Sequence, residues 1–342
     1  MSSFQIGLVV LGGLVLLGLL VHSAWSARVN TPKQAQESAP TPAPENEPLF
    51  EETSFGSLEM HVHPLRRLHI DPLIDAVAPI NLDPLAEEVA GEAALAAMPS
   101  TRRVGTKPFS IEGFNSDLQE WETPTAGARY SVFQAGVQLA NRNGALNDIE
   151  YSEFVVKTQA FADAVGATPE FPEMRHEVAR ARELDNFASA HDAQLGLNLR
   201  ARHASWSPGY VHQMAAQHGF VPGQLPGRMV LPSALEGAPP LLSLTFDSQA
   251  ALAEDPAQSA IRELILHLDV PQVDRAEQPF ARMCQAAQAM AQSMDGLVTD
   301  DNGQPLAPQA LDGIAHELQR LYDMLDERDV AAGSALARRL FS

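Results

Sequence analysis

An uninterrupted apolar run near the N-terminus constrains this chain more than any other feature. Residues 4–25 carry no charged side chain, and the stretch from Ile6 to Val21 consists of aliphatic residues and glycine. As a helix, this run would extend about 33 Å, enough to cross a hydrocarbon layer of roughly 30 Å. The sequence therefore predicts a transmembrane anchor at residues 1–27, which makes the lipid bilayer an expected partner.

The charges around this run set its expected orientation. No Lys or Arg precedes it, and the first basic residues, Arg28 and Lys33, follow it. A cleaved signal peptide begins with a positive region, so an uncleaved anchor is favoured, although Ser-Ala-Trp-Ser-Ala could serve as a cleavage site. The positive-inside rule then puts the N-terminus outside and the remainder in the cytoplasm. Gly12 and Gly13 could support close helix packing, so self-association through the anchor is a hypothesis.

The segment after the anchor is predicted to be a disordered linker at residues 28–57. Residues 30–48 contain five prolines among Ala, Gln, Ser and Glu. Such a composition buries too little apolar surface to fold and favours polyproline II. Extended at about 3.1 Å per residue, the segment would reach roughly 60 Å. It is either a spacer for a soluble head or an inert linker of the same composition.

Composition excludes several functions. The chain has 43 acidic against 23 basic residues and a net charge of −20, which argues against nucleic-acid binding. Its single cysteine, Cys284, excludes an internal disulfide and a four-cysteine zinc site. No phosphate-binding, dinucleotide, metalloprotease or hydrolase motif occurs. His61, His63 and His69 lack accompanying carboxylates, so a solvated strand edge is favoured over a metal site. We expect no catalytic residues, no metal and no cofactor.

The remaining residues predict an α+β fold in two tandem units. Strands are expected at His63–Ile70, Lys107–Phe114, Arg129–Leu139 (with Gly136 as a bulge), Ala193–Leu199, Leu241–Phe246, Leu264–Val270 and Leu297–Thr299. Helices are expected at Asp83–Met98, Asp148–Val165 (capped by Asp148), Glu173–Ala190, Pro208–His218, Arg275–Met294 and Pro308–Asp326. The last third matches the middle third element by element at an offset of about 130 residues. Each unit is expected to have an antiparallel sheet covered by helices on one face.

Several segments resemble the ZipA family of bacterial cell-division proteins. An anchor ending LLVHSAWSAR and a Pro-rich tether precede LNLRARHAS, QMAAQHGF, PPLLSLTFD, LDVP, DGLVTDD and PQALDGIAHEL, in the family's order. The resemblance implies a split β-α-β domain without catalytic activity, whose open sheet face binds the C-terminal tail peptide of FtsZ. It also implies that the anchor lies in the inner membrane, with a periplasmic N-terminus and a cytoplasmic C-terminal domain. The expected domains are the anchor at 1–27, the linker at 28–57, a degenerate ZipA-like unit at 58–190, the FtsZ-binding domain at 191–327 and a C-terminal tail at 328–342.

The resemblance also implies which residues form the peptide groove. Residues matching the family's groove are Leu199, Leu225, Gly227, Thr245, Asp247 and His267. Period-2 alternation independently puts one set of residues on the face opposite the apolar core positions: Leu241, Ser243, Thr245, Ile265 and His267. For Leu199 the two arguments conflict, because alternation alone sends Leu195, Leu197 and Leu199 to the core.

Two classes of function follow. The first is an inner-membrane adaptor that binds the FtsZ tail and tethers or stabilises the Z ring at the division site. The second is an envelope scaffold or interaction protein whose open sheet face is covered internally and does not bind FtsZ. A third possibility is that residues 58–190 form the binding unit and the C-terminal unit supports it.

Overall fold

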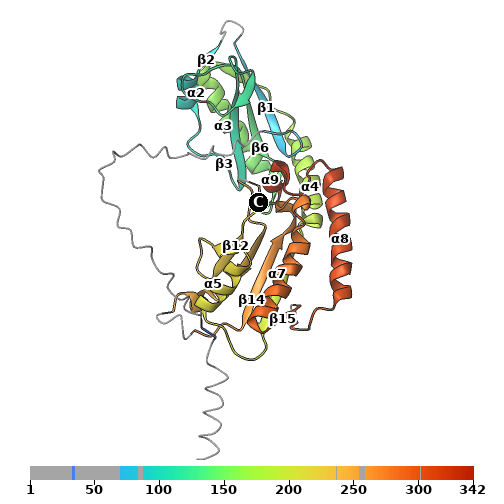
Figure 1. Ribbon diagram of the computed structural model, residues 1–342. Coiled ribbons are helices and arrows are strands. Elements are labelled where there is room, and N and C mark those ends of the chain that lie inside the picture. The colour runs from blue at the N-terminus through green and yellow to red at the C-terminus, as the bar shows by residue number, and fades with distance from the viewer. Residues whose placement is uncertain (1–32, 35–69, 84–87, 236, 254–258, 301) are drawn as a thin grey trace, which may run out of the picture. The chain divides into compact units, whose positions relative to one another are not determined.

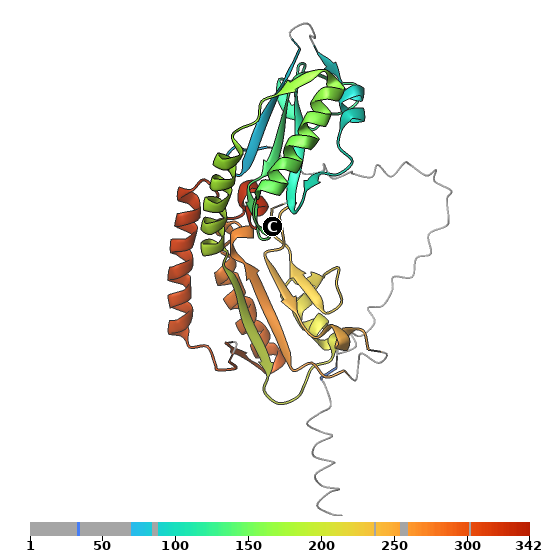
Figure 2. The same ribbon diagram turned by 180° about the vertical axis from the view of Figure 1, so that it is seen from behind.

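The computed structural model describes residues 33–34, 70–83, 88–235, 237–253, 259–300 and 302–342. They fall into two compact units (Figure 1, and Figure 2 from behind). The first unit comprises the described residues of Pro42–Asp192 together with Ala335–Ser342, and the second those of Met1–Thr41 together with Ala193–Ser334. Within these ranges, no helix combines the length and the apolar character needed to cross a bilayer. The predicted anchor, the linker (except Lys33 and Gln34) and the strand expected from His63 lie outside them, apart from Ile70, which is not in a strand.

The first unit is built on an antiparallel seven-stranded sheet with the order β3-β4-β6-β1-β9, in which β2 also pairs with β6 and β5 with β4. The strands are β1 (Asp75–Leu82), β2 (Val89–Ala90), β3 (Arg103–Val104), β4 (Lys107–Asn115), β5 (Glu120–Glu122), β6 (Arg129–Gln138) and β9 (Ala167–Pro169). A separate two-stranded ladder joins β7 (Ala140–Asn141) and β8 (Gly144–Ala145). The helices are α2 (Gly91–Ala97), α3 (Asp148–Val165), α4 (Met174–His191) and α9 (Ala335–Leu340).

Alternation along β6 explains how the first unit forms its core. Phe133, Ala135 and Val137 are fully buried on one face of the strand. The Phe133 ring packs edge-on against Phe161 of α3, with 5.2 Å between the ring centroids. Helix α3 therefore covers this face of the sheet, and Gln134, Gly136 and Gln138 point to the other.

The second unit has a six-stranded antiparallel sheet with the order β11-β12-β13-β14-β10-β15. The strands are β10 (Gln194–Ala201), β11 (Val221–Pro222), β12 (Arg228–Leu231), β13 (Leu242–Thr245), β14 (Glu263–Asp269) and β15 (Gly296–Thr299). The helices are α5 (Pro208–Gln217), α6 (Ser248–Ala251), α7 (Pro279–Met294) and α8 (Pro308–Glu327), with short 3-10 turns η1 (Val270–Gln272) and η2 (Arg275–Glu277). Helix α7 packs against β10 and β14, and α5 packs against α7. Arg275, in the turn η2 just before α7, forms ion pairs with Asp323 and Asp326 of α8.

The two units share one order of elements. In each, a central strand (β1 or β10) is followed by a helix, two paired strands (β4 and β6, or β13 and β14), a helix (α3 or α7), an edge strand (β9 or β15) and a last helix (α4 or α8). The neighbours in the sheets also correspond, as β4-β6-β1-β9 and β13-β14-β10-β15. Helices α3 and α7 also end alike, because the residue after each helix, Gly166 or Asp295, has the left-handed backbone conformation.

Most predicted elements are confirmed, with local corrections. Asn147, and not Asp148, caps α3, because its side chain accepts from the backbone of Ile149 and Glu150 in a capping box. Helix α7 starts at Pro279 and not at Arg275, since proline favours the first helical turn. Among the described residues of the helix expected at Asp83–Met98, only Gly91–Ala97 is helical.

The glycine expected to form a bulge has a different role. Gly136 pairs regularly with Val77 and Ser110, and the irregularity in this ladder lies at Phe114 and Asn115 of β4. A Cβ atom at Gly136 would lie 2.7 Å from Cγ2 of Ile70. This glycine therefore permits the close approach of Ile70 to the sheet.

Candidate functional site

The candidate site lies on the face of the second sheet that α7 does not cover. Leu244, Leu264, Leu266 and Leu268 are almost completely buried on the helix side. The side chains between them belong to the opposite face, as the pleat requires. There, Ser243 pairs with His267 and Thr245 with Ile265 across the β13–β14 ladder. These four half-exposed residues form one continuous patch.

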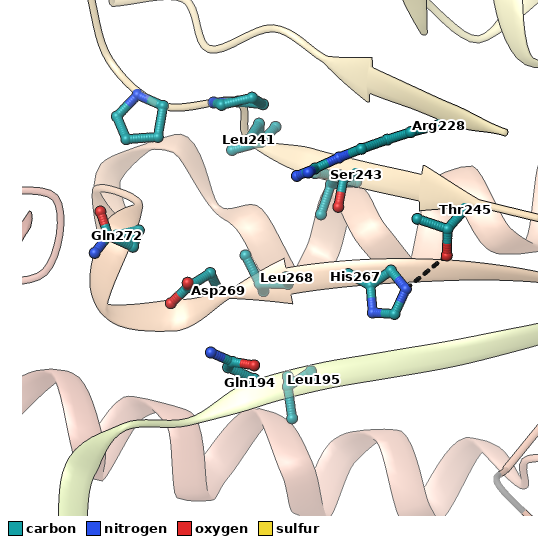
Figure 3. Close-up of a pocket in the computed structure, with 13 residues that line it drawn as sticks. Gln194, Leu195, Arg228, Leu241, Ser243, Thr245, His267, Leu268, Asp269 and Gln272 are labelled. Atoms are coloured by element: carbon teal, nitrogen blue, oxygen red, sulfur yellow. Dashed lines mark hydrogen bonds between the residues drawn. The ribbon is translucent and has the colours of Figure 1, made fainter. Parts of the chain in front are cut away.

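This face is hollowed to a volume of about 500 Å³. Figure 3 shows His267 and Thr245 at one end of the hollow and Leu241 and Gln272 towards the other. Strands β10, β12, β13 and β14 all contribute to it. The lining residues are Gln194, Leu195, Arg228, Pro239, Pro240, Leu241, Leu242, Ser243, Thr245, His267, Leu268, Asp269 and Gln272.

A hydrogen bond fixes the imidazole in this hollow. The distance from Thr245 Oγ1 to His267 Nε2 is 2.8 Å. Burial, and secondarily the positive charge of Arg228, lowers the pKa of His267 below 6.5. His267 is therefore neutral at neutral pH, and an apolar ligand can cover it without burying a charge. The charged groups of the lining are Arg228 at one edge and Asp269 at the end of β14.

The structure brings together four of the predicted groove residues. Ser243, Thr245 and His267 line the hollow, and Ile265 lies beside Thr245 on the same face. Period-2 alternation selects all four, because both strands have a buried face that fixes their register.

The assignment of Leu199 to the groove is wrong. Leu199 is fully buried, and Leu197 is 5% exposed, on the face that packs under α7. Its neighbour Asn198 pairs with Ile265 and so belongs to the open face. Alternation along β10 therefore gave the correct face, and the matching of family positions did not.

Three further predicted residues lie outside the hollow. Leu225 is 61% exposed in the turn before β12. Gly227 has φ +73°, and a Cβ atom there would lie 2.7 Å from the carbonyl oxygen of Phe246, so it shapes the approach of β12 to β13. Asp247 is exposed, and its side chain caps α6 by accepting from the backbone N–H of Gln249 at 2.9 Å.

Several lining residues were missed. Asp269 continues the alternation of Ile265 and His267 along β14, so the sequence argument could have included it. The same holds for Gln194, because alternation puts its neighbour Leu195 on the core side of β10. Arg228 begins β12, a short strand without a clear pattern. Pro239 and Pro240 reach the hollow from a loop, and no local signal indicates that position.

The chemistry of the site is that of binding. A shallow, half-apolar hollow on an antiparallel sheet is typical of a domain that holds an extended peptide. Cys284 is half-buried on α7, outside the hollow, and burial raises the pKa of its thiol, which keeps it protonated. In the part of the chain that the structure describes, no three His, Cys, Asp or Glu residues are grouped as metal ligands would be. The histidines at 61, 63 and 69 lie outside that part.

A comparison with protein families finds a match within the second unit. Residues 245–317 match the C-terminal FtsZ-binding domain of ZipA. The match runs from the end of β13 into α8, and confirms the resemblance seen in the sequence over this segment. ZipA proteins are non-enzymatic, membrane-anchored division proteins that bind FtsZ. No curated protein matches the chain.

Proposed function

We propose that this chain is an inner-membrane division adaptor whose second unit binds the C-terminal tail of FtsZ and tethers the Z ring. One observation carries the proposal. Thr245 and His267 form the hydrogen-bonded end of the hollow, and both fall inside the segment that matches the FtsZ-binding domain. Five of the 13 residues that line the hollow lie within the matched segment.

The lining indicates what kind of peptide fits. Among the exposed or half-exposed residues of this face, Pro240, Ile265 and the neutral His267 offer apolar contact, and Arg228 and Asp269 offer one charge of each sign. The chain as a whole carries a net charge of −20. A tail with an apolar centre and neutral or basic flanks suits this surface, because acidic flanks would be repelled.

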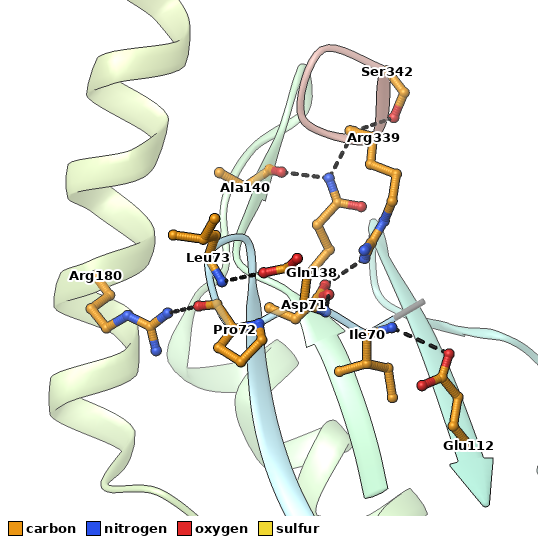
Figure 4. A network of polar contacts seen from close by, with 11 residues as sticks. Ile70, Asp71, Pro72, Leu73, Glu112, Gln138, Ala140, Arg180, Arg339 and Ser342 are labelled. Carbon is orange, nitrogen blue, oxygen red and sulfur yellow. Dashed lines mark hydrogen bonds and ion pairs between the residues drawn. The ribbon is translucent and has the colours of Figure 1, made fainter. Parts of the chain in front are cut away.

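The equivalent face of the first unit is already covered, which supports the second unit as the binding one. Ile70 packs on Gly136, and its backbone N–H donates to Glu112 Oε1 at 3.2 Å. Gly136 and Glu112 belong to the face opposite the core. The chain segment at Ile70 therefore lies across this face (Figure 4).

The C-terminal helix covers the end of the same face. Arg339 of α9 pairs with Asp75 of β1 at 2.5 Å, and Gln138 donates to the Arg339 carbonyl at 2.8 Å. Asp75 and Gln138 are the first pair of the β1–β6 ladder. The first pair of the corresponding β10–β14 ladder is Gln194 and Asp269, and both line the hollow. The position filled by α9 in the first unit is thus open in the sheet of the second.

The proposal extends to the other parts of the chain. Residues 1–27 would anchor it in the inner membrane with a periplasmic N-terminus, and 28–57 would link the anchor to the folded part. Residues 58–190 would be a degenerate copy of the FtsZ-binding domain at 191–327, which the shared order of elements supports. Residues 328–342, predicted as a tail, include α9, so part of this segment would serve the first unit. Self-association through the anchor and a lipid bilayer as partner remain predictions.

The second candidate function is a scaffold whose open face is covered internally. The first unit supports this scaffold function, because Ile70 and α9 cover the face of its sheet opposite the core. The hollow of the second unit favours the adaptor. A binding measurement on the whole chain separates the two.

The test is binding of a fluorescent FtsZ tail peptide to the full chain in detergent micelles, followed by anisotropy. Saturable binding is expected, and His267→Glu should weaken it at least tenfold by placing a carboxylate in the hollow beside Asp269. Gln319→Glu adds the same charge on the exposed side of α8 and should leave binding unchanged. Absence of binding by the wild-type chain would refute the adaptor, and equal weakening by both variants would move the site away from the hollow.

A further inference from the structure

A residue of the predicted linker is paired with the second unit. The Lys33 N–H donates to the Ser205 carbonyl at 2.6 Å, and the Ser207 N–H donates to the Lys33 carbonyl at 2.9 Å. These two bonds make a parallel β-bridge between Lys33 and Trp206. Trp206 is bridged on its other side to Ile261 in antiparallel fashion. The backbone of Lys33 therefore lies beside the Trp206–Ile261 pair as a third strand would.

The Lys33 side chain is held independently of its backbone. Its Nζ donates to the Met294 carbonyl at 3.0 Å and lies 3.9 Å from the Asp295 carboxylate. It also lies 6.0 Å from the centre of the Tyr210 ring. Met294 ends α7, where carbonyls lack partners within the helix and the helix dipole attracts a cation.

The surface that receives Lys33 is packed and hydrogen-bonded within the second unit. Trp206 is fully buried, and its indole N–H donates to the same Met294 carbonyl at 2.9 Å. The side chain of Ser207 caps α5 by accepting from the Tyr210 backbone. Lys33 of the linker is thus held twice, by backbone pairing with the Trp206 segment and by the contact of its amine with the end of α7.

We infer that Lys33 docks the juxtamembrane segment on the second unit and thereby holds the peptide-binding hollow close to the bilayer. This inference rests on the proposed anchor at 1–27. The chain between Ala27 and Lys33 spans six Cα–Cα steps, which reach roughly 20 Å when extended. The composition of residues 30–48 alone predicted a reach of roughly 60 Å. The sequence from Gln34 to Ile70 then connects the second unit to the first, and does not separate the second unit from the membrane.

The contact itself is tested without a membrane. Lys33→Pro removes both the N–H donor and the amine, whereas Gln36→Pro places the same residue beyond the bridge as a control. In the full chain in micelles, hydrogen exchange at the Ser207 amide should be at least tenfold faster in Lys33→Pro than in wild type or Gln36→Pro. Lys33→Ala keeps the backbone bridge and should give a smaller increase. Equal exchange at Ser207 in Lys33→Pro and wild type would overturn the docking.

The consequence is tested in nanodiscs. A donor dye is attached to Leu252→Cys, which is 70% exposed, in a Cys284→Ala background, and an acceptor dye is placed on the lipid headgroups. Energy transfer should fall in Lys33→Pro and stay unchanged in Gln36→Pro. Unchanged transfer, with faster exchange at Ser207, would overturn the claim that the bridge holds the unit near the bilayer. Failure of the wild-type chain to enter nanodiscs would refute the anchor instead, and the exchange experiment would still decide the docking.

Discussion

Replacing Arg339 by alanine should destabilise the first unit selectively. Arg339 is close to the end of the chain, yet it pairs with Asp75 at the start of β1, 264 positions earlier. Asp75 is 1% exposed, and its other carboxylate oxygen accepts from the Asp71 N–H at 2.8 Å. The substitution leaves a buried carboxylate without its countercharge.

The expected loss is about 3 kcal/mol. Removing one partner of a buried ion pair typically costs about 3–5 kcal/mol. The lower value applies here, because the Asp71 N–H remains and the Arg339 side chain is 12% exposed. For a unit of this size, such a loss lowers the melting midpoint by roughly 10 °C.

The effect should depend on pH in a defined direction. Burial is the main cause that raises the pKa of Asp75, and Arg339 opposes this rise. A carboxyl with a raised folded pKa favours folding most at low pH, and its contribution declines as the pH rises through that pKa. Without Arg339 the pKa rises further. The difference between variant and wild type is therefore smallest in acid and grows as the pH increases.

Calorimetry between pH 4 and 8, with hydrogen exchange resolved over β1 and β6, measures this effect. Arg320→Ala is the matched control, since its pair with Glu317 on α8 is exposed and contributes only about 0.3 kcal/mol. The double variant Asp75→Asn with Arg339→Met should recover part of the stability, because no buried charge remains. A midpoint for Arg339→Ala within about 2 °C of wild type at pH 7, or a loss that does not grow with pH, would refute the reasoning.

Three further predictions concern the second unit. Leu199→Asp should destabilise it by more than about 4 kcal/mol, because it buries an unpaired carboxylate under α7; a folded variant in circular dichroism melts would contradict the core position. Gly227→Ala should cost about 1–3 kcal/mol in urea unfolding, since φ is +73° and the new Cβ would meet the Phe246 carbonyl. Because burial lowers the pKa of His267, stability should decline as the pH falls below about 6.5 through the folded pKa, and His267→Gln should remove that part of the slope; an unchanged slope would count against the burial of the imidazole.

Much of the candidate site could be predicted from alternation. Strands β13 and β14 have one face buried under helices, so every second residue is apolar, and the residues between them had to face outward. The same rule placed Leu199 correctly in the core. Matching of family positions put it in the groove, because matching carries no information about which face a residue occupies.

Strand β1 could not be predicted, although it is an interior strand of the first sheet. Its segment, Asp75–Leu82, contains Pro79, and a proline argues against a central strand. In the structure, β9 pairs with β1 only from Ile80 onward, and the Pro79 carbonyl accepts from the Glu170 N–H. Partners that are distant in sequence, and not local propensity, make this segment a strand.

The sequence by itself determined the α+β class, most helices, the apolar N-terminal run and the resemblance of the last third to the C-terminal domain of ZipA. These depend on periodicity, capping and local motifs, which act over a few residues. Only the tertiary structure decided that Arg339 covers the first sheet, that Lys33 pairs with Trp206, and that Arg228 and two loop prolines border the hollow. Each of these is a contact between segments far apart in the chain, and its partner is fixed by the packing of the whole unit and not by the residues nearby.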